Sequence, residues 1–556
     1  MRQEVTEDTP DLTDRPPTGF PSGAGDARAG KLVEEREVAE FAHRLADSEV
    51  GPQTYYTNKW GLPLAVVVIG MFMSVLDTSI VNVAIPTMQG QYGASPGDIS
   101  WVATAYTLCL GVVVPTSAWL GERLGLRRMY LIALIGFSAF SALCGTAGDL
   151  NTMILYRILQ AIPGGVIPVT CLTILYRMVP PAKLGAAMGM YGFGIVVAPG
   201  VGPAMGGFLV EYVDWRLIFY INVPIGIIGA ILAIVVLPDF PASKGRRFDL
   251  PGFVCVATAS FSLLLAVSEG QSWGWTGYRV LILLAVSLNM FVLFVLIELQ
   301  VKQPLLDVRA FRYWPFVNSL LLIAVLSTGM FSLLYYVPQF LQVGQGITPM
   351  NTGLTVLPQA AGMALIMPFA GSIYDRIGAR WPAIIGVLIS LVGAFMMVRI
   401  SADTSRSELI MWTIIRSGGL GFAFMPIMTS GLASLPPSVI GSGSALSRLC
   451  QQVSNALGVA ALTALSTAQQ AQIYSDRAPL LAGSGPNVLG QVRSMQQQGQ
   501  GGLILVWQQL HTEISAQSYS DIFLLMAFST VLALALTLFI RGGRPDPNVE
   551  REVVEI

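Results

Sequence analysis

Long apolar runs separated by short polar segments make up most of the chain. A helix crosses the roughly 30 Å of hydrocarbon in a bilayer with about 20 predominantly apolar residues. Stretches of that length predict fourteen transmembrane helices, near residues 60–82, 98–120, 129–147, 151–175, 185–209, 217–237, 250–268, 278–297, 315–338, 351–373, 381–400, 408–430, 439–466 and 520–540. The pattern therefore predicts an all-α integral membrane protein.

The basic residues of the connecting segments predict the orientation. With a cytosolic N-terminus, thirteen Lys and Arg residues fall in inside loops and six in outside loops. The inside residues are Arg123, Arg127, Arg128, Arg177, Lys183, Lys244, Arg246, Arg247, Lys302, Arg309, Arg312, Arg376 and Arg380, and the outside residues are Arg216, Arg279, Arg399, Arg406, Arg477 and Arg493. Because cytoplasmic loops carry an excess of Lys and Arg, both termini are predicted to be cytosolic.

Three polar segments lie outside the predicted helices. Residues 1–59 are rich in Pro, Gly and acids and contain no apolar signal-peptide core, which predicts a largely disordered cytosolic tail. A short surface helix at residues 31–49 is the alternative for part of that tail. Residues 467–516, rich in Gln, Ser and Gly, are predicted as one long solvated external loop, and residues 541–556 as a second cytosolic tail.

Composition narrows the class of function. Of the 556 residues 53% are hydrophobic and 12% are charged, whereas soluble domains average about 25% charged residues. A net charge of -1 gives no case for nucleic-acid binding. The five cysteines are scattered in apolar runs without a CxxC pair, so no disulfide framework and no metal site is expected. The sequence contains no P-loop, HExxH or Ser-His pair, so we expect neither a cofactor nor direct use of ATP, and an embedded enzyme or receptor is a remote alternative.

Two predicted cytosolic hairpins share a pattern of an acid, an arginine, a glycine and further basic residues. The first copy contains Glu122, Arg123, Gly125 and Arg127, and the second contains Asp375, Arg376 and Gly378. The glycine permits a tight turn, and the acid can pair with an arginine or cap a helix N-terminus. Such contacts can latch one half of a carrier against the other, and two copies suggest a duplicated transporter half.

With these hairpins the chain resembles the major facilitator superfamily, and in particular its fourteen-span drug:proton antiporter branch. The resemblance covers about residues 60–466. The hairpins are similar to the GxLaDrxGrk signature of that superfamily, from which the first copy departs at Ala118, Glu122 and Leu126. Further segments similar to signatures of this branch lie at residues 76–86, 157–165, 199–207, 215–216 and 221–226.

The resemblance implies a major facilitator fold with a six-helix bundle at 60–237, two additional central helices with cytosolic linkers at 238–314, and a second six-helix bundle at 315–540. It implies a proton-coupled efflux transporter in a bacterial inner membrane that exports small amphipathic compounds by alternating access. Export of one dedicated lipid, siderophore or antibiotic is the alternative. The expected partners are small-molecule substrates, protons and the lipid bilayer, and docking of a periplasmic adaptor protein is left open.

Asp77 is the only acidic residue well inside a predicted span. A carboxylate in hydrocarbon is costly, so Asp77 should be neutral, paired or in contact with water. Arg157 in the fourth predicted span lies at a similar depth, roughly 8–9 Å below the outer surface at about 1.5 Å per residue, and is the expected partner. Burial favours the neutral carboxyl and a nearby arginine the charged one, so Asp77 and Arg157 are candidates for proton coupling. A fixed ion pair, or recognition of substrate charge at Asp77, are the alternatives.

Small residues and prolines fill the fifth predicted span. Small side chains allow close helix contact and sliding, and proline removes a backbone hydrogen bond. A hinge or a proton-tight seam is expected at Pro199, Gly202, Pro203, Gly206 and Gly207, with an ordinary packing face as the alternative.

Aromatic, Met and Gln residues of several spans are candidates for substrate binding, because Met and aromatic side chains suit varied apolar ligands. They are Phe72, Met73, Tyr106, Tyr191, Phe193, Phe331, Tyr335, Tyr336, Gln339, Phe424 and Met425. Packing against lipid or neighbouring helices is the alternative for each. Arg416 and Arg448 also lie deep in predicted spans, and either bind anionic substrate groups or serve a structural role.

Overall fold

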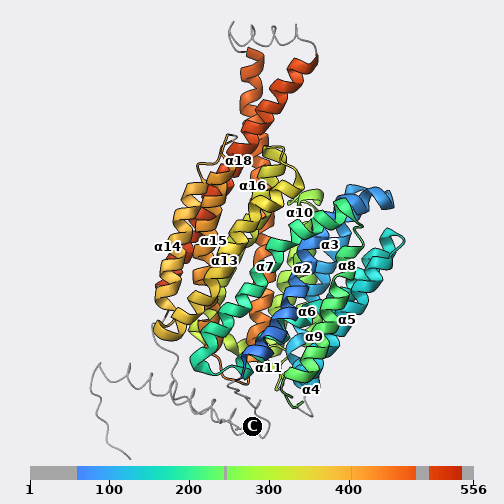
Figure 1. The fold of residues 1–556 in the computed structure, drawn as a ribbon, viewed down its shortest axis with the longest axis vertical. Coiled ribbons are helices and arrows are strands. Elements are labelled where there is room, and N and C mark those ends of the chain that lie inside the picture. The colour runs from blue at the N-terminus through green and yellow to red at the C-terminus, as the bar shows by residue number, and fades with distance from the viewer. Residues whose placement is uncertain (1–58, 243–246, 402, 484–499, 541–556) are drawn as a thin grey trace, which may run out of the picture. The chain divides into compact units, whose positions relative to one another are not determined.

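The computed structural model describes residues 59–242, 247–401, 403–483 and 500–540, and within these ranges every regular element is a helix (Figure 1). The predicted tails 1–59 and 541–556 lie outside the described residues, apart from Lys59. The longer helices are α2 (Gly61–Tyr92), α3 (Pro96–Val113), α4 (Thr116–Leu124), α5 (Leu126–Thr146), α6 (Leu150–Met178), α7 (Leu184–Tyr212), α9 (Asn222–Val236), α10 (Leu250–Trp273), α11 (Tyr278–Gln300), α12 (Trp314–Gln339), α13 (Pro349–Ile377), α14 (Arg380–Met397), α15 (Arg406–Ala433), α16 (Ile440–Gly483) and α18 (Gln500–Thr537). Short helical segments are η1 (Pro181–Lys183), α8 (Leu217–Tyr220), η2 (Val308–Arg312) and η3 (Phe340–Gly344).

Each of the fourteen predicted spans coincides with helical structure. Among the described residues, twelve helices are long and apolar enough to cross a membrane, or thirteen if α3 and α4, bent by 61°, form one span. The remaining predicted span corresponds to α16, whose buried residues include the polar Ser442, Ser444 and Ser447. The all-helical class is confirmed, whereas the count of fourteen crossings stays a prediction.

Some helix ends differ from the predicted span ends. Helix α2 continues to Tyr92, well beyond the predicted end at residue 82, because a helix need not stop where the hydrocarbon stops. The second predicted span is interrupted between Val113 and Thr116, where Pro115 lacks a backbone N–H. The sixth is divided into α8 and α9 at Ile221.

The predicted external loop is largely helical in its flanks. Helix α16 continues to Gly483 and α18 begins at Gln500, so the predicted boundaries 467 and 516 do not mark helix ends. The two helices run on side by side past the other helices (Figure 1). The Ala, Leu and Gln residues of these flanks favour helix, which a reading based on polarity alone overlooked.

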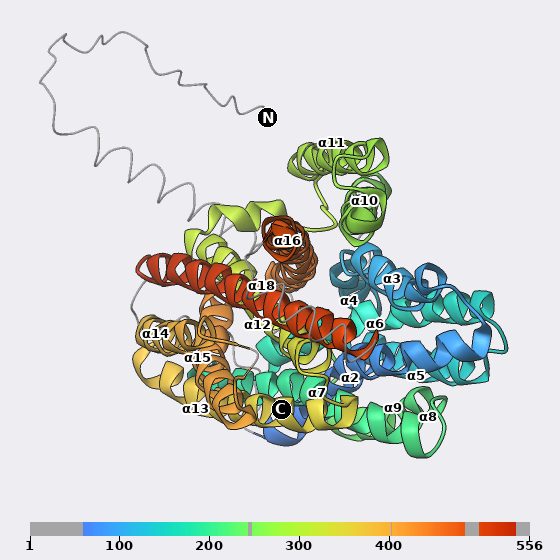
Figure 2. The same cartoon turned by 90° about the horizontal axis from the view of Figure 1, so that it is seen from above.

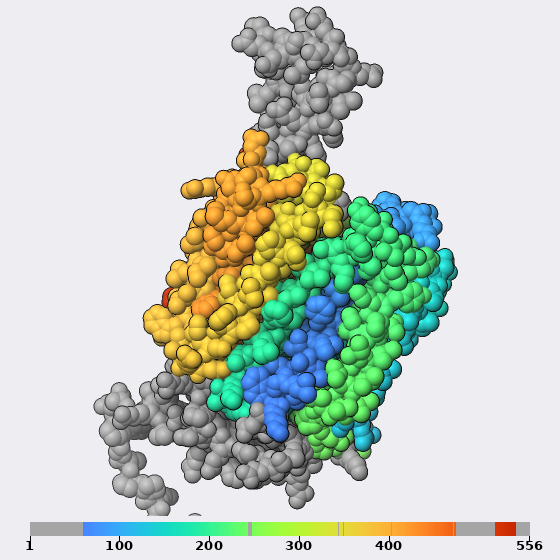
Figure 3. Space-filling model, viewed as in Figure 1, coloured from blue at the N-terminus to red at the C-terminus, as the bar shows by residue number. Residues whose placement is uncertain are grey.

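We call α2 to α9 the N-terminal half and α12 to α18 the C-terminal half. Helix α7 lies between α2 of its own half and α13 of the C-terminal half (Figure 3). The additional helices α10 and α11 pack against each other, and α10 also contacts α3 and α16 (Figure 2). A hydroxyl contact of 3.4 Å between Thr104 and Ser268 joins α3 to α10. The additional pair therefore touches one helix of each half.

Candidate functional site

The predicted contact between Asp77 and Arg157 is present. Arg157 Nη1 donates a hydrogen bond of 2.6 Å to Asp77 Oδ2, and the exposed fractions of the two residues are 0% and 1%. Asp77 lies on the buried face of α2, and Arg157 lies in the outer part of α6 by the predicted orientation. The ion pair is therefore closed off from solvent in this conformation.

Two amide side chains complete the surroundings of Asp77. Gln160 Nε2 and Asn222 Nδ2 each donate a hydrogen bond of 3.0 Å to Asp77 Oδ1. Gln160 follows Arg157 by one helical turn on α6, which places both on the same face. Both oxygens of a fully buried carboxylate thus have donors, which is the condition under which a buried charge is tolerated.

Arg157 is held by four groups besides the carboxylate. Its Nη1 donates to Gln160 Oε1 at 2.7 Å, and its Nε donates to the Val102 carbonyl at 3.4 Å. The guanidinium carbon lies 3.9 Å from the centre of the Tyr106 ring and 5.8 Å from that of Phe219. Stacking of a guanidinium on an aromatic face is a favourable cation–π contact.

The break between α8 and α9 positions Asn222. As the first residue of α9, Asn222 is fully buried, and its Nδ2 also donates to Ser141 Oγ at 3.1 Å. Ser141 in turn donates to the Phe219 carbonyl at 2.8 Å. Helices α2, α3, α5, α6, α8 and α9 therefore all contribute to one polar network inside the N-terminal half.

The ion pair is costly to break in this conformation. Without Asp77, the Arg157 guanidinium would be buried without its counter-charge. Removing one partner of a buried ion pair costs about 3–5 kcal/mol. Separation of the pair therefore requires that water or another group replaces the lost contact.

The predicted hinge residues of α7 face different surroundings. A Cβ on Gly202 would lie 2.0 Å from Ser79 Oγ, and one on Gly206 would lie 2.9 Å from Ile80 Cγ1, so both glycines pack against α2. Gly207 has open space around it. Helix α7 is continuous through Pro199 and Pro203, which are predicted hinge positions as well.

On its opposite face, α7 approaches α13 so closely that the two backbones are almost in contact. A Cβ on Gly371 would lie 1.9 Å from the Gly185 carbonyl oxygen, and one on Gly189 would lie 2.5 Å from the Met367 carbonyl oxygen. Towards the other end, a Cβ on Gly200 would lie 2.3 Å from Ala360 Cβ. We call these contacts the α7–α13 seam. Small residues allow this approach and side chains would prevent it.

The second copy of the hairpin pattern joins the two halves. Asp375 on α13 accepts hydrogen bonds from the backbone N–H groups of Gly185, at 2.7 Å, and Ala186, at 2.9 Å, in the first turn of α7. A carboxylate at a helix N-terminus is stabilised by the orphan N–H groups and the helix dipole. Arg376 is exposed beside it, and Gly378 ends α13 at a φ of +82° that favours glycine.

The first copy occupies the corresponding place in the N-terminal half. Glu122 lines a pocket with Arg177 and with Gly441, which belongs to the first turn of α16 in the other half. Gly125 has a φ of +81°, and its missing side chain leaves room for the Phe240 carbonyl. The Arg127 guanidinium donates to the Ile234 carbonyl, and Arg123 is exposed.

The residues predicted to bind substrate fall into several places. Met73, Tyr106, Tyr191, Tyr336, Phe424 and Met425 are buried, Phe72, Phe331 and Gln339 are half-buried, and Phe193 and Tyr335 are each 41% exposed. Tyr106 belongs to the Asp77 network, and Met425 of α15 packs against Gly192 of α7, between the halves. Phe193 shares the outward face of α7 with exposed Met190, which is the surface that lipid would cover.

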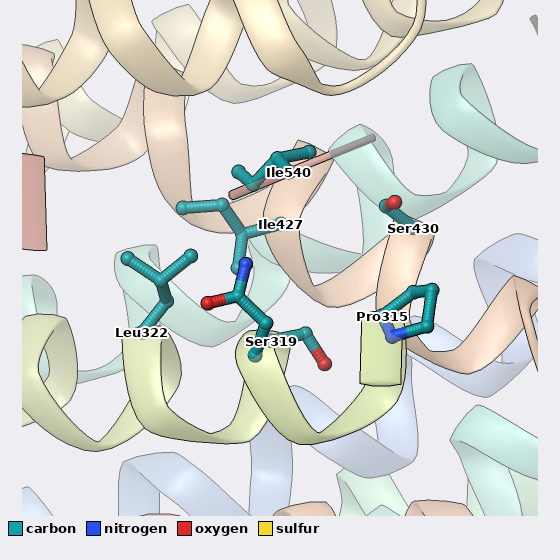
Figure 4. A pocket seen from close by; sticks show the side chains of 7 residues that line it. Pro315, Ser319, Leu322, Ile427, Ser430 and Ile540 are labelled. Carbon is teal, nitrogen blue, oxygen red and sulfur yellow. The ribbon is translucent and has the colours of Figure 1, made fainter. Parts of the chain in front are cut away.

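A second pocket lies in the C-terminal half. It is lined by Pro315, Asn318, Ser319, Leu322, Ile427, Ser430 and Ile540 (Figure 4). Neither this pocket nor the one beside Glu122 contains a residue predicted to bind substrate. Those candidates lie mostly at helix–helix contacts in this conformation.

Arg448 and Arg416 have different neighbours. Half-buried Arg448 on α16 donates to Gln451 at 3.3 Å and interacts electrostatically with Tyr106 and Tyr191 of the N-terminal half. Arg416 on α15 is 1% exposed and has no carboxylate partner among the described residues. Arg448 therefore faces the interface between the halves, and Arg416 lies within one of them.

Sequence reasoning missed the contribution of Asn222 to the site. It appeared only as part of a family-like segment at residues 221–226, although a lone Asn in an apolar run is itself a signal for a buried polar contact. Tyr106 is predicted as a substrate contact, and in this structure its ring covers Arg157.

Comparison with known proteins shows what the chain is similar to. The model of the Major Facilitator Superfamily matches residues 67–459. The tetracenomycin C resistance and export protein of Streptomyces glaucescens is 30% identical over 421 residues, which cover 75% of this chain and 78% of that protein. The putative multidrug resistance protein MdtD of Escherichia coli O81 (strain ED1a) is 33% identical over 406 residues, which cover 72% of this chain and 85% of that protein. Among solved structures, the proton:xylose symporter XylE bound to 6-bromo-6-deoxy-D-glucose has a TM-score of 0.54 at 13% identity over 87% of this chain and 96% of that chain, a likeness of fold.

Proposed function

Since the chain belongs to the major facilitator superfamily, we propose that it is a proton-coupled efflux transporter that exports small amphipathic compounds by alternating access. The family and the helical fold indicate a transporter rather than an enzyme. Relatives named for multidrug resistance and for tetracenomycin C export support the outward direction of transport. The observation that carries proton coupling is Asp77, a carboxylate with no exposed surface that is paired with one buried arginine.

The ion pair can exist in two states that differ in charge. In the closed state Arg157 and the amide groups of Gln160 and Asn222 all donate hydrogen bonds to an ionised Asp77. In an open state water reaches Asp77 from the outer side, a proton binds, and the neutral carboxyl no longer attracts Arg157. Each state favours a different arrangement of α2 against α6, so proton binding shifts the balance between conformations.

Helix α7 connects this change to the other half. Directly after Asp77 on α2, Ser79 Oγ donates to the Ala198 carbonyl of α7 at 3.5 Å, and Gly202 approaches the same serine. On its opposite face α7 forms the α7–α13 seam with the C-terminal half. A displacement of α2 is thereby passed to α13 without flexible side chains between them. Pro199, Gly202, Pro203 and Gly206 are the positions at which α7 would bend or slide.

Asp375 and Glu122 serve as the latch in this scheme. The two hydrogen bonds from α7 to Asp375 fix the predicted cytosolic ends of α7 and α13 together. A further bond of 3.2 Å from the Tyr176 hydroxyl of α6 to the Thr429 carbonyl of α15 crosses the halves. Breaking these contacts is the step that would open the transporter to the cytosol.

We place the substrate at the interface between the halves. Tyr106, Tyr191 and Arg448 lie near one another there, and Met425 meets Gly192. Aromatic and methionine side chains adapt to varied apolar ligands. Because Tyr106 also stacks on Arg157, a bound compound at this place would sense the state of the ion pair.

Export of one dedicated antibiotic is the second candidate, and the relative named for tetracenomycin C favours it. A panel of chemically unrelated dyes separates the two. Efflux of several unrelated dyes supports broad export, and efflux of none with resistance to one antibiotic supports a dedicated exporter.

In this proposal the protein lies in a bacterial inner membrane. Both termini face the cytoplasm, because alternate loops carry an excess of Lys and Arg. A reporter that fluoresces only in the cytosol, fused after Ile556, should be bright. A dark C-terminal fusion with an intact membrane-inserted chain would overturn that orientation.

The test of coupling compares wild type with Asp77→Asn in inverted membrane vesicles loaded with a dye that the panel identifies. Asn keeps the shape and remains uncharged, so dye accumulation driven by a pH gradient should fall at least about tenfold, the loss expected when one coupled proton is removed from the cycle. The double variant Asp77→Asn/Arg157→Gln leaves no unpaired buried charge and controls for instability. It should still equilibrate dye down a concentration gradient but not accumulate it. Gradient-driven accumulation by Asp77→Asn at the wild-type level would remove Asp77 from the coupling step.

A further inference from the structure

Arg416 is a buried cation without a counter-charge among the described residues. Its exposed fraction is 1%, its Nε atom has no hydrogen-bond partner, and its Nη1 atom reaches only the Met397 sulfur at 4.0 Å. A thioether is a weak acceptor. A guanidinium in such a place is costly unless a group of opposite charge occupies the site for part of the transport cycle.

The space beside Arg416 corresponds to that of Asp77 in the N-terminal half. Asp77 stands nine residues before Pro86 in α2, and Gly329 stands nine residues before Pro338 in α12, the first helix of the C-terminal half. A Cβ on Gly329 would have a single neighbour within 4 Å, the Nη2 atom of Arg416 at 3.6 Å. The carboxylate that neutralises Arg157 thus has no counterpart at Arg416.

The backbone of Arg416 is closely packed against a neighbouring helix. Gly393 of α14 packs against the backbone of Arg416, where a Cβ would lie 2.5 Å from its nitrogen. The helices packed against α15 carry further buried polar atoms without partners, namely Ser332 Oγ, Gln359 Oε1 and Ser390 Oγ. Ser332 follows Gly329 by about one turn of α12. In the described part of the C-terminal half, unsatisfied buried polar atoms therefore lie on α12, α13 and α14 as well as at Arg416.

We propose that Arg416 and the empty side-chain position at Gly329 form a binding site for a small monovalent anion. The ligand is either free chloride or the carboxylate or phenolate of a transported compound, because a guanidinium binds such groups through paired N–H donors. The transported-compound source rests on the proposed function, whereas binding of an anion to this site does not.

The binding test measures the unfolding temperature of the detergent-purified full-length chain by tryptophan fluorescence. Chloride, benzoate or the uncharged benzyl alcohol is titrated at constant ionic strength with sodium sulfate, whose anion is divalent and strongly hydrated. Wild type should show a saturable rise of several degrees with chloride or benzoate and none with benzyl alcohol. A response to chloride alone identifies free anion as the ligand, and a response to benzoate alone identifies the organic anionic group.

Variants at Gly329 separate charge from folding. Gly207→Ala, at a glycine of α7 with open space around it, is the control and should keep the anion response. Gly329→Asp supplies a carboxylate to Arg416, so it should lose the response and should unfold at a higher temperature than isosteric Gly329→Asn in anion-poor buffer. Arg416→Gln should lose the response as well. An equal response in wild type, Gly329→Asp and Arg416→Gln, or no response of wild type to either anion, would overturn the proposal.

Transport supplies a second readout. In inverted vesicles Arg416→Gln should reduce uptake of anionic carboxyfluorescein at least tenfold relative to uptake of cationic ethidium if the ligand is part of the cargo. Equal reduction for both dyes assigns the site to free anion. If wild type moves neither dye, the proposed export function fails, while the unfolding experiment still decides whether the anion site exists.

Discussion

Arg157 lies on α6, the fourth predicted span of the first half, and Arg416 lies on α15, the fourth predicted span of the second half; both are almost completely buried. Arg157 meets Asp77, Gln160 and the Tyr106 ring, whereas Arg416 meets only a weak sulfur acceptor. At the place on α12 that matches Asp77 the chain has Gly329. One half thus contains a complete ion pair and the other half contains one member of such a pair.

The difference suggests that the N-terminal and C-terminal halves, although similar in fold, have different functions. A carboxylate that binds a proton loses its attraction to a neighbouring arginine, and this property suits proton coupling. An arginine beside an empty side-chain position can only attract an anion from elsewhere, which suits binding. The α7–α13 seam joins the two halves through close backbone contacts, and the proposed mechanism uses this seam to connect them.

The largest effect is expected from replacing each arginine by methionine. Arg157→Met leaves Asp77 buried without its partner and should lower the free energy of unfolding by about 3–5 kcal/mol. Arg416→Met removes a buried charge that has no partner, so in anion-poor buffer stability should change by less than about 1 kcal/mol or rise. Detergent-induced unfolding titrations measure both. Equal destabilisation by the two substitutions would remove the contrast between the halves.

The next effect concerns communication across the α7–α13 seam. Gly371→Ala places a Cβ 1.9 Å from the Gly185 carbonyl, and this overpacking should cost about 1–3 kcal/mol in the state with a closed seam. Dye efflux should then fall on the order of tenfold, because 1.4 kcal/mol corresponds to a factor of ten. Gly207→Ala, on α7 with open space around it, is the matched control and should transport normally. Equal efflux by the two variants would show that the seam does not transmit the change.

A smaller effect separates the two copies of the latch. Asp375→Asn replaces a charged acceptor of two helix N-terminal N–H groups by a neutral one, at a cost of about 1 kcal/mol. Opening at the predicted cytosolic end should become easier by about fivefold, as measured by labelling of a cysteine introduced at Ala186. Glu122→Gln in the first copy tests whether the corresponding contact behaves alike. Unchanged labelling in Asp375→Asn would assign the aspartate to packing alone.

The smallest effect is expected at the Tyr106 hydroxyl. Its oxygen is buried and has no hydrogen-bond partner in the part of the chain that the structure describes, whereas its ring stacks on Arg157. Tyr106→Phe should change stability by no more than about 0.5 kcal/mol, and Tyr106→Ala should lose the stacking and reduce efflux. Loss of efflux in Tyr106→Phe would instead give the hydroxyl a role in proton transfer.

The sequence was sufficient for the features that depend on local pattern or on rarity. Apolar run lengths located the helices, and the lone intramembrane acid and an arginine at similar depth identified the ion pair. The hairpin repeat pointed to Asp375, whose carboxylate could either pair with arginine or cap a helix, and the structure shows the cap.

Features that depend on tertiary packing could not be predicted from the sequence. Asn222 reaches Asp77 only because the chain turns between α8 and α9, and the orientation of Phe193 and Tyr191 depends on which neighbours flank α7. Gly207 belongs to the predicted hinge segment, but it lacks the close packing against α2 that Gly202 and Gly206 show. The extended ends of α16 and α18 were missed because polarity was taken as a sign of a loop.

Release of protons on substrate binding tests the central role of Asp77 most directly. Purified protein in a weakly buffered detergent solution with a pH indicator receives a dye that the efflux panel has identified. If substrate binding shifts the chain from the open state with a neutral Asp77 to the closed state with the ion pair, wild type should release up to one proton per chain and Asp77→Asn should release none. Equal proton release by wild type and by Asp77→Asn would contradict the account.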